Sequence, residues 1–338
     1  MTYNSKVLLI YTGGTIGMVQ NEQGVLQPFK LDRISDAIPL LKNVSYRIDS
    51  CQLESIIDSS DMCVKVWAEI AQIVEKEYDK YDGFVVLHGT DTMAYTASAL
   101  SFMLENLGKP VVLTGSQLPL GMLRSDGRGN IVGALEIASA QKTNIPEVSI
   151  FFEDKLYRGN RSTKISAQNF DAFASFNYPP LATAGIDISY NKHLVLYPES
   201  NDFKVHKSLN ENVAILTLFP GITSKLVNSV LSTPDLEAVV ISSYGSGNAP
   251  TEGWFIDALQ KAAEKGIIFY DVTQCKSGTV RIGQYATSYD LGRIGVVSGY
   301  DITIEAAITK LMYLLGNYKD RNTIRRMLTQ SIRGEITV

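Results

Sequence analysis

Residues 7–17 read VLLIYTGGTIG, and this stretch decides the fold class. The run Val7–Tyr11 predicts a buried strand, and the polar turn Thr12–Thr15 follows it directly. The same design recurs where the expected strand Phe84–Leu87 is followed by His88-Gly89-Thr90-Asp91-Thr92. Open α/β sheets bind ligands at the carboxyl ends of their strands. The two loops are therefore the first candidates for a functional site.

Strands and helices alternate along the rest of the chain, which is typical of an α/β protein with a largely parallel sheet. The pattern predicts further strands at Val111–Thr114, Val148–Phe152, Val213–Leu218, Ala238–Ser242 and Ile267–Asp271. It predicts helices at Met62–Glu77, Thr92–Leu107, Arg124–Ala140, Ile222–Leu231, Glu252–Lys265, Thr303–Leu315 and Asn322–Ser331.

The length of 338 residues is enough for two domains, each with its own core. Prolines and scattered polar residues interrupt the alternation between residues 178 and 212. We expect a larger N-terminal α/β domain over residues 1–190, with a mostly parallel sheet and the candidate loops. A linker over 191–212 and a smaller, flavodoxin-like α/β domain over 213–338 complete the prediction.

Composition excludes several classes of function. Hydrophobic residues make up 45% and charged residues 20% of the chain, and the formal net charge is -4. No dense run of Lys and Arg suggests nucleic acid binding, and no apolar stretch reaches the roughly 18 residues of a membrane span. The apolar run Val7–Ile10 is too short for the core of a signal peptide, so we expect a cytoplasmic protein.

The cysteines and histidines predict neither disulfides nor a metal site. Three cysteines lie far apart without a CxxC pair, as expected for reduced thiols in the cytoplasm. Three histidines form no HxxxH motif and no cluster with cysteine. The glycines at 13, 14 and 17 are spaced GGxxG and not GxGxxG, and no Walker motif follows, so we expect no cofactor.

The first loop offers a nucleophile beside exposed backbone. A threonine hydroxyl such as that of Thr15 can attack a substrate carbon when a neighbouring group takes its proton. Glycine at position 14 lets backbone N–H groups approach a small ligand. The alternative is that Thr12 and Thr15 only cap local structure.

The second loop strengthens the catalytic interpretation, because Asp91 lies beside the hydroxyl of Thr90 just before an expected helix. The helix N-terminus would favour negative charge developing on a substrate oxygen. Alternatively, Asp91 or Thr92 caps that helix. A general-base role for His88 would need a nucleophile within hydrogen-bond reach, and no GxSxG motif occurs. We expect His88 to pack at the strand end and contribute a hydrogen bond.

Two further segments carry suitable polar groups. The loop Asp58–Met62 is dense in short polar side chains and can hold the ammonium and carboxylate groups of a free amino acid. It can equally be a helix start capped by Ser60 or Asp61. Lys164 can accept a proton if it is desolvated, although a lysine in such a run is more commonly solvated.

These motifs resemble those of bacterial-type L-asparaginases. Residues 11–17 and 87–93 are similar to the two characteristic segments of that family, in order and about 75 residues apart. The similarity extends over nearly the whole chain, and the segment YRGNR at 157–161 resembles the cytoplasmic type I branch. The additional matching segments are residues 58–62, 114–117, 124–126, 161–164 and 244–248.

The resemblance implies hydrolysis of L-asparagine to L-aspartate and ammonia. Thr15 would be the nucleophile that forms a covalent acyl-enzyme. Thr90, Asp91 and Lys164 would form the supporting relay, in which Lys164 and Asp91 help to move the proton off Thr90. Backbone N–H groups near Thr15 and Thr90, with Gly14 among the substrate-binding residues, would stabilise the oxyanion.

The resemblance also implies how substrate is held and how subunits assemble. Ser59, Ser60 and Asp91 would bind the α-carboxylate and α-ammonium groups, and Asp58 would shape that loop. Family members are homotetramers, built as pairs of intimate dimers in which a neighbour's second domain closes each site. Asn248 is the candidate contribution from the neighbouring subunit.

The chain departs from the family pattern in three places. Val25 stands where many members carry a loop tyrosine that helps to activate the nucleophile. Residues 283–290 hold no glutamate for the neighbour's site, and Thr287 falls nearest to that position. Thr163 and Cys275 match an allosteric asparagine site of some type I enzymes, but Ser242 replaces its arginine. We therefore expect weak or absent allosteric activation, which a clearly sigmoidal saturation curve would contradict.

Other functions remain open at this point. A glutaminase-asparaginase, or the amidase subunit of a tRNA-dependent amidotransferase, would keep the fold and change the substrate. The missing loop tyrosine raises the further alternative of a non-catalytic regulator that binds an amino acid.

Overall fold

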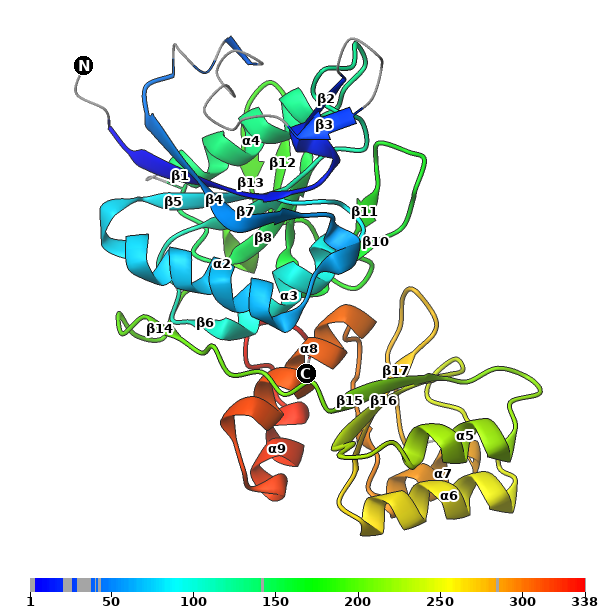
Figure 1. The fold of residues 1–338 in the computed structure, drawn as a ribbon. Coiled ribbons are helices and arrows are strands. Elements are labelled where there is room, and N and C mark those ends of the chain that lie inside the picture. The colour runs from blue at the N-terminus through cyan, green and yellow to red at the C-terminus, as the bar shows by residue number, and fades with distance from the viewer. Residues whose placement is uncertain are drawn as a thin grey trace. The chain divides into compact units, whose positions relative to one another are not determined.

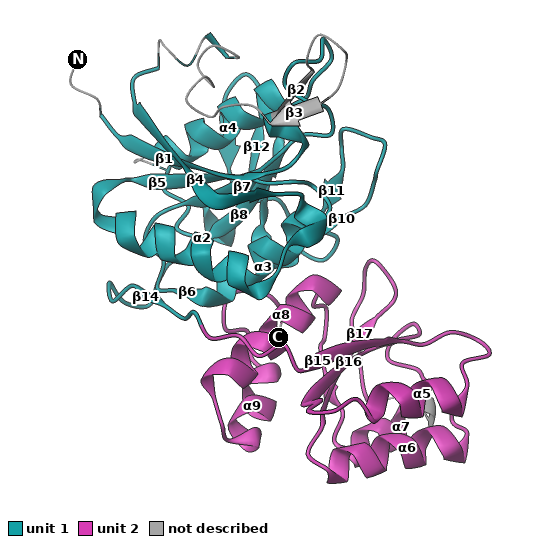
Figure 2. Ribbon diagram, viewed as in Figure 1, with its two compact units in different colours: residues 1–207 teal, residues 208–338 magenta. Residues whose placement is uncertain are grey.

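A computed structural model describes residues 4–20, 26–28, 38–39, 41, 44–140, 143–283 and 286–337. The chain divides into two compact units, residues 1–207 and 208–338, coloured separately in Figure 2. This division falls inside the segment 191–212, and the boundaries and linker proposed from sequence stay predictions. No helix in the described ranges has the length and apolar character needed to cross a membrane.

An eight-stranded mixed sheet forms the centre of the first unit (Figure 1). Five neighbouring strands are parallel, and the three at one edge are antiparallel. In spatial order the strands are β13 (Ile188–Tyr190), β12 (Ala182–Ala184), β9 (Lys155–Arg158), β8 (Val148–Phe152), β7 (Val111–Thr114), β5 (Gly83–Leu87), β1 (Lys6–Gly13) and β4 (Arg47–Ile57). The mostly parallel sheet of the predicted α/β class is confirmed.

Helices cover both faces of this sheet. In Figure 1, α4 (Gly127–Ser139) lies on one face, and α2 (Val64–Glu77) and α3 (Met93–Met103) lie on the other. Alternate residues of β1 pack on the α4 side, where Val7, Leu9 and Tyr11 join the buried core. Burial of both faces explains why β1, β5, β7 and β8 are almost continuously apolar in sequence.

Short two-stranded sheets complete the first unit. They pair β2 (Met18–Gln20) with β3 (Leu26–Pro28), β6 (Leu104–Glu105) with β14 (Lys204–Val205), and β10 (Thr163–Lys164) with β11 (Phe173–Ala174).

The order of the strands positions the candidate loops. β1 pairs with β4 on one side and with β5 on the other, so the chain reverses its direction across the sheet at β1. The loops after β4, β1 and β5 therefore leave neighbouring strands at the same edge. A reversal of this kind is the topological switch point where α/β proteins bind ligands.

The second unit holds a parallel four-stranded sheet in the order β15 (Val213–Thr217), β16 (Ala238–Ser243), β17 (Ile268–Thr273), β18 (Val297–Ser298). Apolar side chains from α5, α6 and α7 pack on this sheet in one core cluster. The helices of this unit are α5 (Ser224–Leu231), α6 (Gly253–Glu264), α7 (Ala286–Ile294), α8 (Ile304–Asn317) and α9 (Arg321–Leu328).

A fully buried ion pair joins α8 to the last residues of the second unit. Lys310 and Glu335 are both 0% exposed, and Lys310 Nζ lies 2.5 Å from Glu335 Oε1. The ammonium group also donates to the Gln330 carbonyl at 2.7 Å, and Glu335 accepts the Arg333 N–H at 2.7 Å. These bonds compensate both charges for the loss of water.

Asp271 in β17 is a buried acid of a different kind. Its side chain is 0% exposed, and the Ser243 hydroxyl, which would favour the charged form, does not outweigh the effect of burial. Burial raises the pKa of the carboxyl group to about 7. The folded protein thus keeps a proton that the unfolded chain releases near pH 4, so stability falls as the pH rises through this window.

Replacement of Asp271 by asparagine should remove this pH dependence. We expect the free energy of unfolding of Asp271→Asn, relative to the wild type, to rise by about 3 kcal/mol between pH 5 and pH 8. Urea unfolding curves of the two proteins at both pH values measure this difference. A difference that stays constant with pH would mean that Asp271 is already ionised in the folded protein at pH 5.

Candidate active site

Three loops meet through glycine backbone at the switch point. Gly14 has φ +86°, and a Cβ atom there would lie 2.5 Å from both Cα and N of Gly89. A Cβ atom on Gly89 would lie 2.4 Å from Ser59 Oγ. The loops after β1, β5 and β4 therefore touch at positions where no side chain fits, and Gly89 lies against both Gly14 and Ser59.

Replacement of Gly14 by alanine should disrupt this contact. The added methyl group meets rigid backbone of Gly89, and the residue must also keep a positive φ. We expect Gly14→Ala to lower the free energy of unfolding by at least about 1 kcal/mol and to reduce turnover strongly. Thermal unfolding and activity assays check this, with Gly129→Ala as control because a Cβ there meets nothing within 4 Å. Equal behaviour of the two variants would contradict the close contact.

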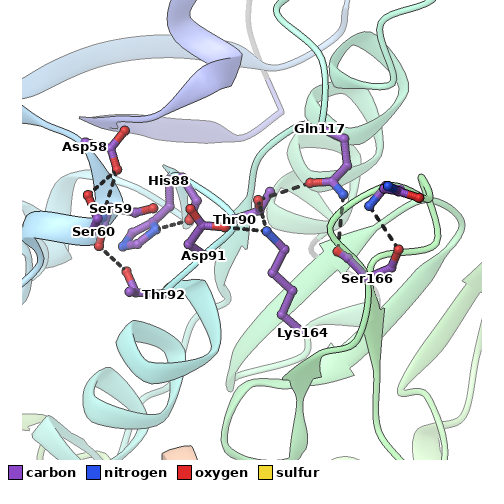
Figure 3. A network of polar contacts seen from close by, with 12 residues as sticks. Asp58, Ser59, Ser60, His88, Thr90, Asp91, Thr92, Gln117, Lys164 and Ser166 are labelled. Atoms are coloured by element: carbon purple, nitrogen blue, oxygen red, sulfur yellow. Dashed lines mark hydrogen bonds and ion pairs between the residues drawn. The ribbon is translucent and has the colours of Figure 1, made fainter.

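A lysine joins the two polar groups of the second loop. Lys164 Nζ donates to Thr90 Oγ1 at 2.8 Å and to Asp91 Oδ1 at 2.6 Å (Figure 3). Thr90 is buried, and the Lys164 side chain is 17% exposed, while that of Asp91 is 68% exposed. Lys164 is thus a mostly covered, ion-paired side chain, and the interpretation of it as a solvated lysine is wrong.

Gln117 extends this network on its other side. The hydroxyl of Thr90 donates to Gln117 Oε1 at 3.1 Å, and Gln117 Nε2 donates to the carbonyls of Ser166 and Asn169 at 3.3 and 3.1 Å. The backbone N–H of Gln117 donates to the Asp126 carboxylate at 2.9 Å. The Thr90 hydroxyl is therefore fixed between an amide and an ammonium group.

Sequence analysis gave Gln117 no role, although a signal was present. The residue follows β7, the next parallel strand beyond β5, so its loop opens at the same edge of the sheet. The positional rule that selected the first two loops also applies to this one.

The carboxylate of Asp58 stabilises the loop after β4 through hydrogen bonds within that loop. Asp58 Oδ1 accepts from the backbone N–H of Ser60 at 2.9 Å and from the Ser60 hydroxyl at 2.8 Å. These bonds hold the pKa of the Asp58 carboxyl below its usual value. Asp58 caps the short 3-10 turn Ser59–Asp61, so the expected cap of the following helix by Ser60 or Asp61 is wrong.

The capping alternatives for Thr92 and Thr12 also fail. The Thr92 hydroxyl makes no cap hydrogen bond to α3 and donates to the Ser59 carbonyl at 2.7 Å. The Thr12 hydroxyl, which is buried, donates to the Leu87 carbonyl at 2.9 Å. Both bonds tie neighbouring loops together at the sheet edge.

Thr15 lies directly after the Gly14 contact and begins the 3-10 turn Thr15–Gly17. The turn is closed by a hydrogen bond from the Gly17 N–H to the Gly14 carbonyl at 3.2 Å. The Thr15 side chain is half-buried. Thr15 therefore follows directly on the residue whose backbone meets that of Gly89.

Comparison with known protein families matches both units of the chain. A family model described as "Asparaginase, N-terminal" matches residues 6–196, and one described as "Glutaminase/Asparaginase C-terminal domain" matches residues 212–328. This protein belongs to the asparaginase family.

Three relatives of the asparaginase family match over nearly their full length. L-asparaginase 1 of Escherichia coli K12 is 46% identical over 333 residues, which cover 98% of each chain. The crystal structure of L-asparaginase I from Vibrio cholerae is 41% identical with a TM-score of 0.90 and covers 99% of both chains. The thermostable L-asparaginase from Thermococcus kodakarensis is 32% identical with a TM-score of 0.91, over 98% of this chain and 99% of that one.

The remaining site residues expected from the asparaginase resemblance are divided between the two units. Asn248, in the second unit, donates its backbone N–H to the Tyr244 carbonyl at 2.8 Å, which closes a tight turn. Of the expected allosteric residues, Ser242 is buried in β16 and Cys275 is exposed, both in the second unit, whereas Thr163 lies in the first.

Two expectations concern other parts of the asparaginase chain. Val25, where the family tyrosine is missing, lies outside the described residues. The described ranges contain no group of three or more His, Cys, Asp and Glu side chains that could hold a metal ion.

Proposed function

We propose that this protein is an L-asparaginase that converts L-asparagine and water to L-aspartate and ammonia. The observation that carries the proposal is the contact of the Lys164 ammonium group with both Thr90 Oγ1 and Asp91 Oδ1, beside the Gly14–Gly89 contact. A hydroxyl bound to a cation that is itself paired with an acid suits the transfer of protons to and from a nearby nucleophile.

Thr15 is the nucleophile in this mechanism. Its Oγ attacks the side-chain carboxamide carbon, and the C–N bond breaks as ammonia leaves with an added proton. Water then attacks the resulting ester, releases L-aspartate and restores the hydroxyl group. Thr90, Asp91 and Lys164 form a relay that transfers the protons in these steps. The relay depends on the ion pair between Lys164 and Asp91.

The α-amino and α-carboxylate groups of the substrate bind to the loops after β5 and β4. Ser59, Ser60 and Asp91 hold its α-carboxylate and α-ammonium groups, and Asp58 keeps the Ser60 loop in shape. The hydrogen bonds from Ser60 to Asp58 support this role. Backbone N–H groups of the loops at Gly14–Thr15 and Thr90 stabilise the oxyanion.

The proposal includes a homotetramer, a dimer of dimers, in which Asn248 reaches a neighbour's site. It also includes a cytoplasmic location, and the free state of Cys51, Cys63 and Cys275 agrees with a reducing compartment. Allosteric activation is weak or absent, because Ser242 lacks the guanidinium fork that binds a carboxylate.

Ammonia release by the purified protein tests the function. L-asparagine should be hydrolysed with a kcat/KM at least about 10-fold higher than that for L-glutamine, since one extra methylene in a tight pocket costs about 1–3 kcal/mol. If asparagine yields no ammonia, the protein binds an amino acid without hydrolysing it. A preference for glutamine would make the enzyme a glutaminase.

A further inference from the structure

His88 is the first residue after β5, in the same loop as Thr90 and Asp91, and the proposed mechanism gives it no part. Its side chain is 0% exposed, and both ring nitrogens are engaged. Nδ1 lies 2.7 Å from the carbonyl oxygen of Gly89, and Nε2 lies 2.8 Å from Thr96 Oγ1. Trp67 Nε1 donates to the same Thr96 oxygen at 2.9 Å.

This chain of contacts fixes the position of every proton. The Gly89 carbonyl can only accept, so a neutral His88 ring donates to it from Nδ1, and Nε2 accepts the proton of Thr96 Oγ1. Thr96 Oγ1 in turn accepts from the Trp67 indole, which can only donate. The ring proton of His88 therefore lies on Nδ1.

The same contacts exclude His88 as a general base. Burial lowers the pKa of the imidazole to about 4, although the hydrogen bond to Gly89 opposes that shift. The one nitrogen that could take a proton already accepts from Thr96. A neutral, fully enclosed ring serves to hold its neighbours.

The group that His88 holds is the peptide between Gly89 and Thr90. A trans peptide is planar, so its N–H points away from its carbonyl oxygen. With the Gly89 carbonyl fixed toward His88, the Thr90 N–H must point to the opposite side. No described residue accepts a hydrogen bond from that N–H.

We infer that His88 is a positioning residue, which holds the Gly89–Thr90 peptide so that the Thr90 N–H faces the oxyanion of the reacting carboxamide. This inference rests on the proposed function. The hydrogen-bond chain reaches from α2 through α3 to the loop after β5, so two helices support the direction of one donor.

A matched pair of variants isolates the donor. In His88→Asn the amide nitrogen takes the place of Nδ1 and still donates, whereas His88→Leu has the same shape without a donor. Removal of an oxyanion donor costs about 10²–10³-fold in rate. We expect loss of its support, in His88→Leu, to lower kcat by about 10- to 100-fold with KM changed less than about threefold. His88→Asn should stay within about fivefold of the wild type.

Controls separate this role from a loss of folded protein. Calorimetric titration with L-aspartate counts intact sites, so kcat is expressed per binding site. His206→Leu removes another hydrogen-bonded histidine of the same unit, whose Nε2 lies 2.7 Å from Glu105 Oε2, and should leave kcat unchanged. Equal kcat per site in His88→Leu and His88→Asn would overturn the inference, and an inactive wild type would overturn the proposed function instead.

A measurement on the wild type decides the point even if the variants do not fold. Nitrogen-15 NMR of labelled imidazoles should find His88 neutral at pH 6 with its proton on Nδ1. A proton on Nε2, or a charged ring, would overturn the inference, because Nδ1 could not then act as the neutral donor described above.

Discussion

Thr15→Ala is expected to lower kcat for asparagine hydrolysis by about 10⁴-fold or more. Loss of a nucleophile typically removes this much, since only oxyanion stabilisation and binding remain. KM should change little, because Ser59, Ser60 and Asp91 would still hold the substrate's amino-acid end. Ammonia release under saturating asparagine, followed over hours, measures the residual rate.

The first loop supplies its own control. Thr12 has the same side chain three residues earlier, but its buried hydroxyl donates to the Leu87 carbonyl. Thr12→Val should keep kcat within about fivefold and cost about 1–2 kcal/mol in stability, since that carbonyl loses its partner. If Thr15→Ala kept more than a tenth of the wild-type kcat, another group would have to be the nucleophile.

Lys164→Met should reduce kcat by about 10³-fold, the second largest effect. Methionine keeps most of the side chain's length and removes the ammonium group that joins Thr90 Oγ1 to Asp91 Oδ1. A positioned proton-transfer group is typically worth about 10²–10⁴-fold. Steady-state rates of ammonia release measure the loss, and L-aspartate titration checks that the site still forms.

Lys155→Met is the matched control for the Lys164 variant. Lys155 lies 3.9 Å from Asp171, and both side chains are largely exposed, at 44% and 62%. Exposed pairs of this kind contribute little, so activity and stability should stay near the wild-type values. Similar losses in the two lysine variants would remove Lys164 from the proposed relay.

The strands that matter most were predictable because they are buried on both faces. Val111–Thr114 and Val148–Phe152 have the predicted bounds in the structure, and each is an unbroken apolar run apart from one hydroxyl residue. By contrast, β4 escaped prediction although it is the longest strand of the sheet. It lies at the edge, and its charged residues such as Arg47 and Glu54 hide the expected alternation.

Site residues could be predicted best where their place in the sequence, directly after an expected strand, was enough to identify them. Polar loops after apolar strands indicated Gly14 and Thr90, and a loop dense in short polar side chains indicated Ser59. Parallel pairing of β4, β1 and β5 explains why these loops meet. The bond from Thr90 to Gln117 depends on side-chain conformations across two loops, which no local pattern encodes. The bonds of Lys164 likewise span more than 70 residues of chain, so only the family resemblance connected them.

The buried pair of Lys310 and Glu335 has a practical consequence for protein engineering. A deletion that starts at residue 335 would leave a fully buried ammonium group without the carboxylate that balances its charge. Any shortened or tagged version of the chain should therefore keep Glu335.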